Sequence, residues 1–94
     1  DYDSKTLNIS KFTTVNVEKG FTTKVETNYK SVVVVGPKDV IDNLSSNDVY
    51  IECDLSKNVG NSGSVIIKGI VKSDKYKTIW GTGDCAITIK VENS

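Results

Sequence analysis

Apolar and polar residues alternate along several stretches of the chain, and this period of two predicts β-strands that bury one face. The first such stretch is residues 6–17, whose apolar face would consist of Leu7, Ile9, Val15 and Val17. Phe12 falls out of step with these residues, so we expect a bulge or a second contact face there. A turn at residues 18–20 leads into a shorter predicted strand at residues 21–25.

Three later stretches are also predicted as strands. Residues 49–55 would bury Val49, Ile51, Cys53 and Leu55, and residues 84–92 would bury Cys85, Ile87, Ile89 and Val91. Between them, residues 64–72 carry apolar side chains on both faces, which indicates a largely buried strand. Gly69 interrupts this strand and predicts a bulge or a close approach of another part of the chain.

The run of four valines at residues 32–35 shows no alternation. This is typical of a strand that is covered on both faces, and we expect it to pass through the middle of the domain, out of reach of solvent. Pro37 cannot donate to a strand ladder, and its fixed φ suits the start of a helix. Val40, Ile41 and Leu44 then form a short apolar stripe, which predicts the only helix, near residues 38–44.

Composition supports the same fold class. Thirteen Val and nine Ile stand against three Leu, and this excess of β-branched residues favours strands over helices. The 94 residues are enough for a single small domain, with residues 1–5 expected to be a frayed end. The start at Asp1 suggests a segment cut from a longer polypeptide, and no apolar run is long enough to insert into a membrane.

Charge and missing residue types exclude several functions. Twelve Lys balance twelve acidic residues, so no net charge draws the chain to nucleic acid. The chain has no His and no Arg, which excludes Ser-His-Asp triads, Cys-His pairs and His-based zinc sites. We therefore expect a protein that is not an enzyme, with no cofactor and no metal.

The two cysteines, Cys53 and Cys85, both fall on predicted inward faces, and two explanations stay open. In an exported protein they could form a disulfide that encloses about 30 residues and contributes about 3–4 kcal/mol. In a reduced protein they would be separate buried thiols. Their spacing matches no redox motif.

Acidic pairs and glycine-rich segments give weaker signals. Glu52 and Asp54 share one strand face, but exposed carboxylates of this kind are ordinarily only solvated. The glycine-rich residues 60–63 lack the features of a phosphate loop, so we interpret them as a turn. Residues 73–77 are expected to be a charged turn, residues 78–80 an apolar patch and residues 81–83 a flexible link.

The aromatic residues Tyr76 and Trp80 form a possible contact patch. Trp80 could be a platform on which a sugar or a peptide stacks. A tryptophan in so small a domain more often packs over the edge of the core, and we favour that interpretation. Lys72, Lys75 and Lys77 lie close by in the sequence, enough for weak contact with an anion.

The central block of the chain resembles the signature of the YbbR-like domain family. It runs through residues 32–56 as an apolar strand, Gly36-Pro37, a short helix, a Leu44-Ser45 turn with acidic residues, and a strand that ends in Asp54-Leu55-Ser56. The resemblance implies a mostly β domain whose strands run around the perimeter and cross the centre in a figure of eight. It also implies bacterial domains, often in tandem, held outside the membrane on anchored proteins, some of which regulate a membrane diadenylate cyclase.

Two functional hypotheses follow from these observations. The first is a noncatalytic, extracytoplasmic interaction or spacer domain of a larger bacterial surface or membrane-anchored protein. Its partners would be another protein or sister domains of the same chain, and the isolated segment is expected to be monomeric. The second is a surface adhesin or carbohydrate-binding domain that uses Tyr50, Tyr76 and Trp80 as stacking groups.

Overall fold

The computed structural model describes residues 1–58, 62–83 and 85–93. The described chain is mostly β, with a six-residue α-helix and a 3-10 turn. In chain order the elements are β1 (Tyr2–Ile9), β2 (Phe12–Val15), β3 (Phe21–Val25), β4 (Lys30–Pro37), α1 (Lys38–Asn43), η1 (Ser46–Asp48), β5 (Tyr50–Asp54), β6 (Gly63–Lys68), β7 (Ile70–Lys72), β8 (Trp80–Thr82) and β9 (Ala86–Asn93). The expected glycine-rich turn at residues 60–63 lies largely outside the described residues.

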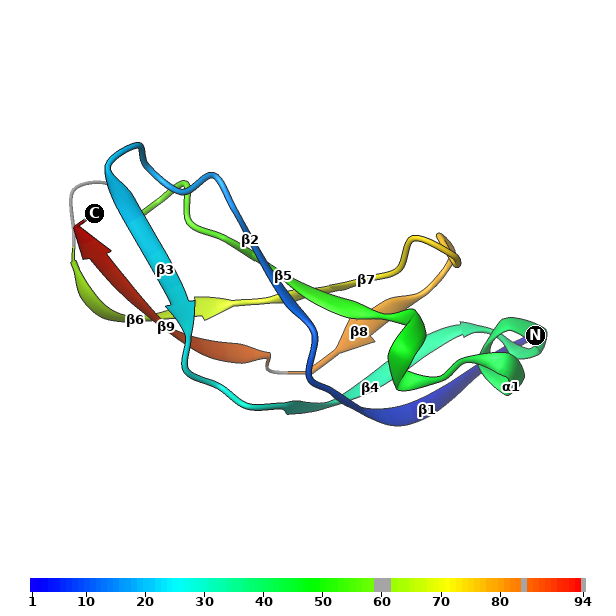
Figure 1. The fold of residues 1–94 in the computed structure, drawn as a ribbon. Helices are drawn as coiled ribbons and strands as arrows, with labels where there is room; N and C mark the ends of the chain where they lie inside the picture. Colours follow the sequence, from blue (N-terminus) through cyan, green and yellow to red (C-terminus); the bar gives the residue numbers. More distant parts are fainter. Residues whose placement is uncertain (59–61, 84, 94) are drawn as a thin grey trace.

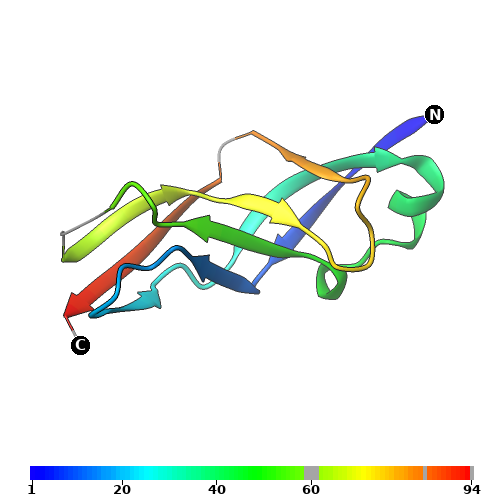
Figure 2. The ribbon, with the colours of Figure 1, turned by 90° about the horizontal axis from the view of Figure 1, so that it is seen from above.

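The molecule is long and narrow. Its principal dimensions are 46 × 19 × 19 Å, and its radius of gyration is 14.3 Å. A compact domain of this length would have a radius of gyration of about 12 Å. The N-terminus lies at the end that carries α1, and β9 runs toward the opposite end (Figures 1 and 2).

The strands form three small sheets, and neighbouring strands in a sheet come from distant parts of the chain. The orders are β1-β4-β8, β2-β5-β7 and β3-β9-β6, which we call sheets A, B and C. The first three strands each belong to a different sheet, and so do the next three. The chain therefore runs back and forth along the long axis and passes repeatedly from one sheet to another (Figures 1 and 2). This confirms the predicted mostly β fold with one short helix.

The N-terminal segment differs from its prediction in two ways. Residues 1–5 do not fray, because β1 pairs with β4 along its whole length, from Tyr2 opposite Pro37 to Ile9 opposite Lys30. The predicted strand at residues 6–17 is also divided. It breaks after Ile9, and β2 begins at Phe12 in sheet B, parallel to β5. The loss of alternation at Phe12 marks the point where the chain changes sheets.

The four valines lie in β4, the central strand of sheet A, but only one of their faces is fully buried. Val32 and Val34 are 3% and 0% exposed, whereas Val33 is 39% exposed. The expectation that both faces are covered was therefore wrong. A strand can be central within its sheet and still have one face open to solvent, because pairing covers its edges and not its faces.

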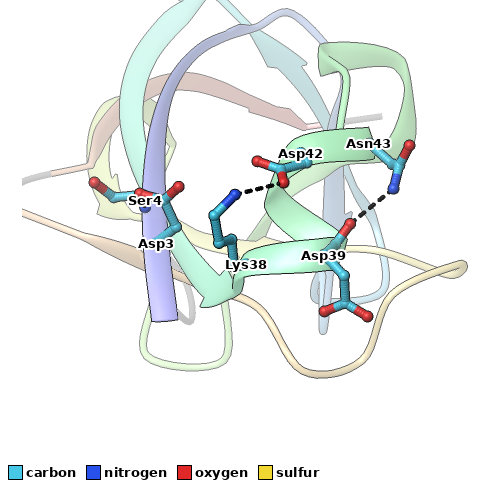
Figure 3. Close-up of polar contacts among 6 residues, drawn as sticks. All are labelled: Asp3, Ser4, Lys38, Asp39, Asp42 and Asn43. Carbon is cyan, nitrogen blue, oxygen red and sulfur yellow. Dashed lines mark hydrogen bonds and ion pairs between the residues drawn. The ribbon is translucent and has the colours of Figure 1, made fainter. Parts of the chain in front are cut away.

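The helix begins where Pro37 ends β4, close to the predicted position. Ile41 and Leu44 bury the apolar stripe against the core, with exposures of 2% and 3%. On the outer side, Lys38 forms a 2.9 Å ion pair with Asp42, and the side-chain amide of Asn43 donates to the Asp39 carbonyl (Figure 3). This short helix therefore covers one end of the core with its apolar side, while polar contacts within the helix stabilise its outer side.

The predicted strand at residues 64–72 is two strands in two sheets, β6 and β7, joined at Gly69. Gly69 is buried, and a Cβ atom at this position would collide with the Cγ2 methyl of Ile51. The predicted close approach is thus confirmed. The expectation that the segment is largely buried was wrong, since Ile66 and Ile70 are 73% and 56% exposed. Their side chains point away from the core on the outer faces of sheets C and B.

A continuous apolar core follows the long axis and receives side chains from all three sheets and from α1. The alternation predicted for β5 and β9 is confirmed at the buried positions. These are Val49, Ile51, Cys53 and Leu55 around β5, and Cys85, Ile87, Ile89 and Val91 in and beside β9. Asp84, the predicted first residue of the last strand, lies outside the described residues. No helix among the described residues is long and apolar enough to cross a membrane.

Candidate functional site: an aromatic groove between β7 and β8

A groove of about 450 Å³ runs between β7 and β8, the outer strands of sheets B and A. We call it the β7–β8 groove. Its aromatic lining residues are Tyr50, Tyr76 and Trp80, its aliphatic ones include Ile70 and Ile79, and its charged ones are Lys72 and Lys77. No carboxylate is among the described residues that line it. It therefore combines apolar surface with positive charge.

The sheet B side of the groove is positioned by strand register. Tyr50 of β5 lies opposite Lys72 of β7, so both side chains project from the same outer face. The Lys72 ammonium forms a 3.0 Å ion pair with Glu52, and this contact raises the pKa of Lys72. Glu52 thus holds Lys72 beside the groove, a structural contact that was not predicted for a carboxylate expected to be only solvated.

Ser73 builds the turn that carries Tyr76. It is the buried polar residue of the described chain, and its hydroxyl donates to the Asp48 carbonyl at 2.6 Å. The same hydroxyl accepts hydrogen bonds from the backbone amides of Lys75 and Tyr76. The predicted charged turn at residues 73–77 therefore has a fixed shape, and Tyr76 packs partly against the core. The sequence suggested a turn here but gave no signal that Ser73 would organise it.

Lysines surround Tyr76. The Lys75 ammonium lies 5.2 Å from the centre of the Tyr76 ring, within the range of a cation–π contact. The Lys77 ammonium donates to the Ser73 carbonyl at 3.1 Å and forms no ion pair with a carboxylate of the described chain. Lys77 is therefore a cation that an incoming ligand can neutralise.

Trp80 lies in a strand, which the sequence did not predict. It also lies on an outer surface, which the sequence offered as an alternative, a stacking platform, but did not favour. Of the segment 81–83 that was expected to be a flexible link, residues 81 and 82 belong to β8, which pairs with β4 and sets Trp80 opposite Val35. The side chain is 44% exposed, and its ring meets that of Tyr2 in an edge-to-face contact with centroids 5.5 Å apart. Trp80 thus does not pack over the core edge as we expected, because β8 turns it outward.

The groove continues into two neighbouring hollows. It shares Tyr50 with a hollow of about 610 Å³ on the outer face of sheet B. It shares Ile70, Val71 and Trp80 with a hollow of about 330 Å³ toward β4. An aromatic residue stands at each junction. The sheet B hollow is also lined by Asp48, Glu52 and Asp74, whereas the described lining residues of the groove and of the hollow toward β4 include lysines and no carboxylate. The groove and the hollow toward β4 therefore form a continuous, positively charged trough suited to an extended ligand. The exposure of Ile70, a main contributor to this surface, was not predicted from the sequence.

Asp54, which shares a strand face with Glu52, has structural partners away from the groove. Asp54 accepts hydrogen bonds from the Asn16 side chain and the Ser56 amide, and these contacts lower the pKa of Asp54. Among residues 1–58, 62–83 and 85–93, no group of three or more Cys, Asp or Glu side chains could hold a metal ion.

Cys53 and Cys85 lie in the core beneath Gly69. Both are buried, and the structure holds them as thiols. The Gly69 amide donates to the Cys85 carbonyl, while Cys53 directly follows Glu52, the partner of Ile70 in β7. Burial raises the pKa of the Cys53 thiol to about 11, with a smaller contribution from the neighbouring Cys85. The thiols act here as core residues, and a disulfide between them stays a prediction.

The Cys53 thiol predicts how stability depends on alkaline pH. The free energy of unfolding should fall as the pH rises from about 9 to about 11, because the unfolded chain loses the thiol proton in this range while the folded chain retains it. Denaturant unfolding at a series of pH values measures the effect. Cys53→Ala should lower stability overall but flatten its decline in this window. Equal slopes in the two proteins would contradict the assignment.

Comparisons with known proteins identify the fold. No family model matches the sequence, and no curated protein matches it. Two solved structures match the fold. One is the YbbR-like domain of a Listeria monocytogenes protein, with a TM-score of 0.63 and 15% identity over 98% of this chain and 95% of that chain. The other is a YbbR-like protein from Streptococcus pneumoniae, with a TM-score of 0.64 and 13% identity over 99% of this chain and 48% of that chain.

These similarities confirm the predicted fold: the chain has the architecture of a YbbR-like domain. It spans nearly all of the Listeria domain and about half the length of the Streptococcus chain. In the Listeria case the matching unit is itself described as a domain of a protein. At this level of identity the likeness concerns the fold, and the site must be interpreted from the residues of this chain.

Proposed function

We propose that this chain is a noncatalytic interaction and spacer domain of a larger bacterial surface or membrane-anchored protein, located outside the cytoplasm. The observation that carries this proposal is the placement of the first and last strands. β1 begins at one end and β9 finishes at the opposite end of a body that is 46 Å long and 19 Å wide (Figures 1 and 2). A polypeptide that enters at one end and leaves at the other adds the full length of the domain to the protein.

The arrangement of strands suits this role. Each sheet joins strands from different parts of the sequence, and β4 and β9 each pair with strands on both sides. Extending the molecule would therefore require several ladders of backbone hydrogen bonds to break together. The resemblance to YbbR-like domains supports the bacterial, extracytoplasmic setting and the larger parent protein.

The proposal includes the absence of catalysis. The chain has no His, and the two acidic residues that share a strand face have structural partners: Glu52 pairs with Lys72, and Asp54 accepts from Asn16 and Ser56. Neither carboxylate lies in an apolar setting that would prepare it for proton transfer at neutral pH. These features support a binding or spacing role.

A specific observation also favours a second candidate, carbohydrate binding. The three aromatic residues proposed as stacking groups, Tyr50, Tyr76 and Trp80, line the same groove although they come from different parts of the chain. Aromatic faces can stack on the apolar faces of sugar rings. A glycan ligand would make the same protein an adhesin domain.

The spacer proposal predicts that the length of the domain adds in series. A fusion of two copies joined by a short stiff linker should have a maximum dimension of roughly 90 Å by small-angle X-ray scattering, about twice the 46 Å of one copy. The single copy measured alone provides the reference. A fusion no longer than one copy would show that the copies fold back on each other and would contradict the proposal.

A further inference from the structure

We propose that the β7–β8 groove binds an extended, acidic peptide segment of a partner protein. This inference rests on the proposed function and deepens it, because it assigns the interaction to one surface and states the chemistry of the partner. It depends on three properties of the described residues: apolar surface exposed to solvent, positive charge without carboxylates, and two strand edges that face one another.

The apolar surface forms a connected band. Ile70 and Trp80 line the groove from opposite sides and are 56% and 44% exposed. The band continues from Trp80 to Tyr2, whose ring contacts the indole and is 69% exposed. Large apolar side chains that gather on a small surface mark sites of contact with other molecules. Trp and Tyr are also the residue types that contribute most to the affinity of protein interfaces.

The charge of the groove selects the partner. Lys72 and Lys77 line it, and Lys68 lines the adjoining hollow. Their described lining residues include no carboxylate, although the whole chain carries equal numbers of Lys and acidic residues. Lys72 is partly neutralised by Glu52, whereas Lys77 has only a backbone carbonyl as its partner among the described contacts. The groove is thus complementary to a segment with negative side chains.

The strand edges favour a peptide. Among the described residues, β7 pairs with β5 alone and β8 pairs with β4 alone, so each strand presents backbone groups on its other side. Between the two strands, Val71 of β7 packs against Gly81 of β8, since the Val71 Cγ2 atom lies 2.7 Å from the position that a Cβ atom on Gly81 would take. We call this line of contact the seam. An extended peptide above this seam could hydrogen-bond to the open edge of one strand and place side chains against the aromatic band.

The lining chemistry favours a peptide over a sugar chain. Besides its aromatic rings, the groove presents the aliphatic side chains of Ile70, Val71 and Ile79. The Ser73 hydroxyl, which could have bonded a sugar, is buried and already has three partners. Aliphatic surface suits apolar peptide side chains, whereas a glycan would need more polar groups to replace the water bound to its hydroxyls.

The test uses the 94-residue chain and a short synthetic peptide, acetyl-Glu-Val-Asp-Phe-Asp-Thr-Glu-amide. Titration should quench or shift Trp80 fluorescence saturably and move the backbone NMR signals of β7, β8 and the 73–77 turn. Trp80→Ala should weaken binding by about tenfold or more, as removal of a central interface aromatic does. Lys77→Glu should weaken it by about three- to tenfold and reduce its dependence on salt.

Two controls make the result specific. Lys24→Glu introduces the same charge change on the outer face of sheet C, away from the groove, and should change affinity by less than about twofold. The same peptide with Lys in place of every acidic residue should not bind. Peptide signals that map elsewhere, or no binding, would overturn the inference.

A titration with glycans tests the alternative that the groove binds carbohydrate. Soluble chitin oligosaccharides that shift the groove signals when the acidic peptide does not would overturn the peptide assignment and support the second candidate function. The spacer role would be unaffected by either result, because it is measured by the length of the two-copy fusion.

Discussion

Replacing Gly69 with alanine is expected to destabilise the protein by about 3 kcal/mol, a large fraction of the stability of a domain of this size. Gly69 lies where the chain leaves β6 in sheet C and enters β7 in sheet B. An added Cβ would collide with the Ile51 Cγ2 methyl and lie 3.3 Å from Ile87 Cγ1 and 3.5 Å from Cys85 Sγ. These atoms belong to core side chains from other parts of the chain, so they cannot move out of the way.

The destabilisation expected for Gly69→Ala comes from lack of space for the added Cβ atom and not from backbone strain. Gly20 and Gly63 have φ angles of +93° and +106°, and an added Cβ atom would meet nothing there, whereas Gly69 has no left-handed φ and its Cβ position is crowded. A double-mutant cycle therefore separates the two explanations. Ile51→Ala alone should cost about 2–5 kcal/mol by leaving a cavity. In the double variant the new methyl of residue 69 partly fills that cavity, so the combined loss should be smaller than the sum of the two, by about 1–3 kcal/mol.

Denaturant unfolding of the four proteins in this cycle gives the measurement. Ile66→Ala serves as a control for a large-to-small change on the exposed face of the neighbouring strand and should cost less than about 0.5 kcal/mol. A Gly69→Ala variant as stable as the wild type, or strictly additive losses in the cycle, would show that the close approach between the sheets is absent.

The parts of this fold that depend on local sequence could be predicted. The period of two in residues 49–55 and 84–92 identifies inward positions such as Ile51 and Ile87, because strand geometry alone alternates the faces. Pro37 followed by a short apolar stripe locates α1 for similar reasons. At Gly69 the sequence indicated either a bulge or a close approach, because glycine inside a strand marks one or the other.

The parts of the fold that depend on contacts between distant segments of the chain could not be predicted from the sequence. Which sheet a strand joins depends on pairings across dozens of residues, so the jump from β1 to β2 near Phe12 was interpreted as a bulge or a second contact face. The outward direction of Trp80 depends on β8 pairing with β4. The groove lies where sheets A and B meet, and no local sequence pattern predicts how two sheets are placed next to each other. The aromatic residues could be named as candidates, but their convergence could not.

The expectation that both faces of the four valines are covered was wrong for the same reason, because burial of a strand face depends on distant segments of the chain. A matched pair of substitutions tests the finding that one face of β4 is open. Val34→Asp should abolish stable folding, because a side chain with 0% exposure would carry an unpaired charge into the core at a cost of several kcal/mol. Val33→Asp should cost about 1 kcal/mol or less, because this side chain is 39% exposed and lies between Thr6 and Thr82 on the outer face.

Thermal melting followed by circular dichroism, together with the dispersion of backbone NMR signals, distinguishes the two variants. If the Val34→Asp protein cannot be isolated, Val34→Ala and Val33→Ala provide a gentler pair, with an expected loss of roughly 2 kcal/mol at the buried position and little at the other. The difference between these neighbours is what matters. Equal sensitivity at both positions would restore the interpretation that both faces of β4 are covered, and the open face of sheet A beside Trp80 would then have to be occupied.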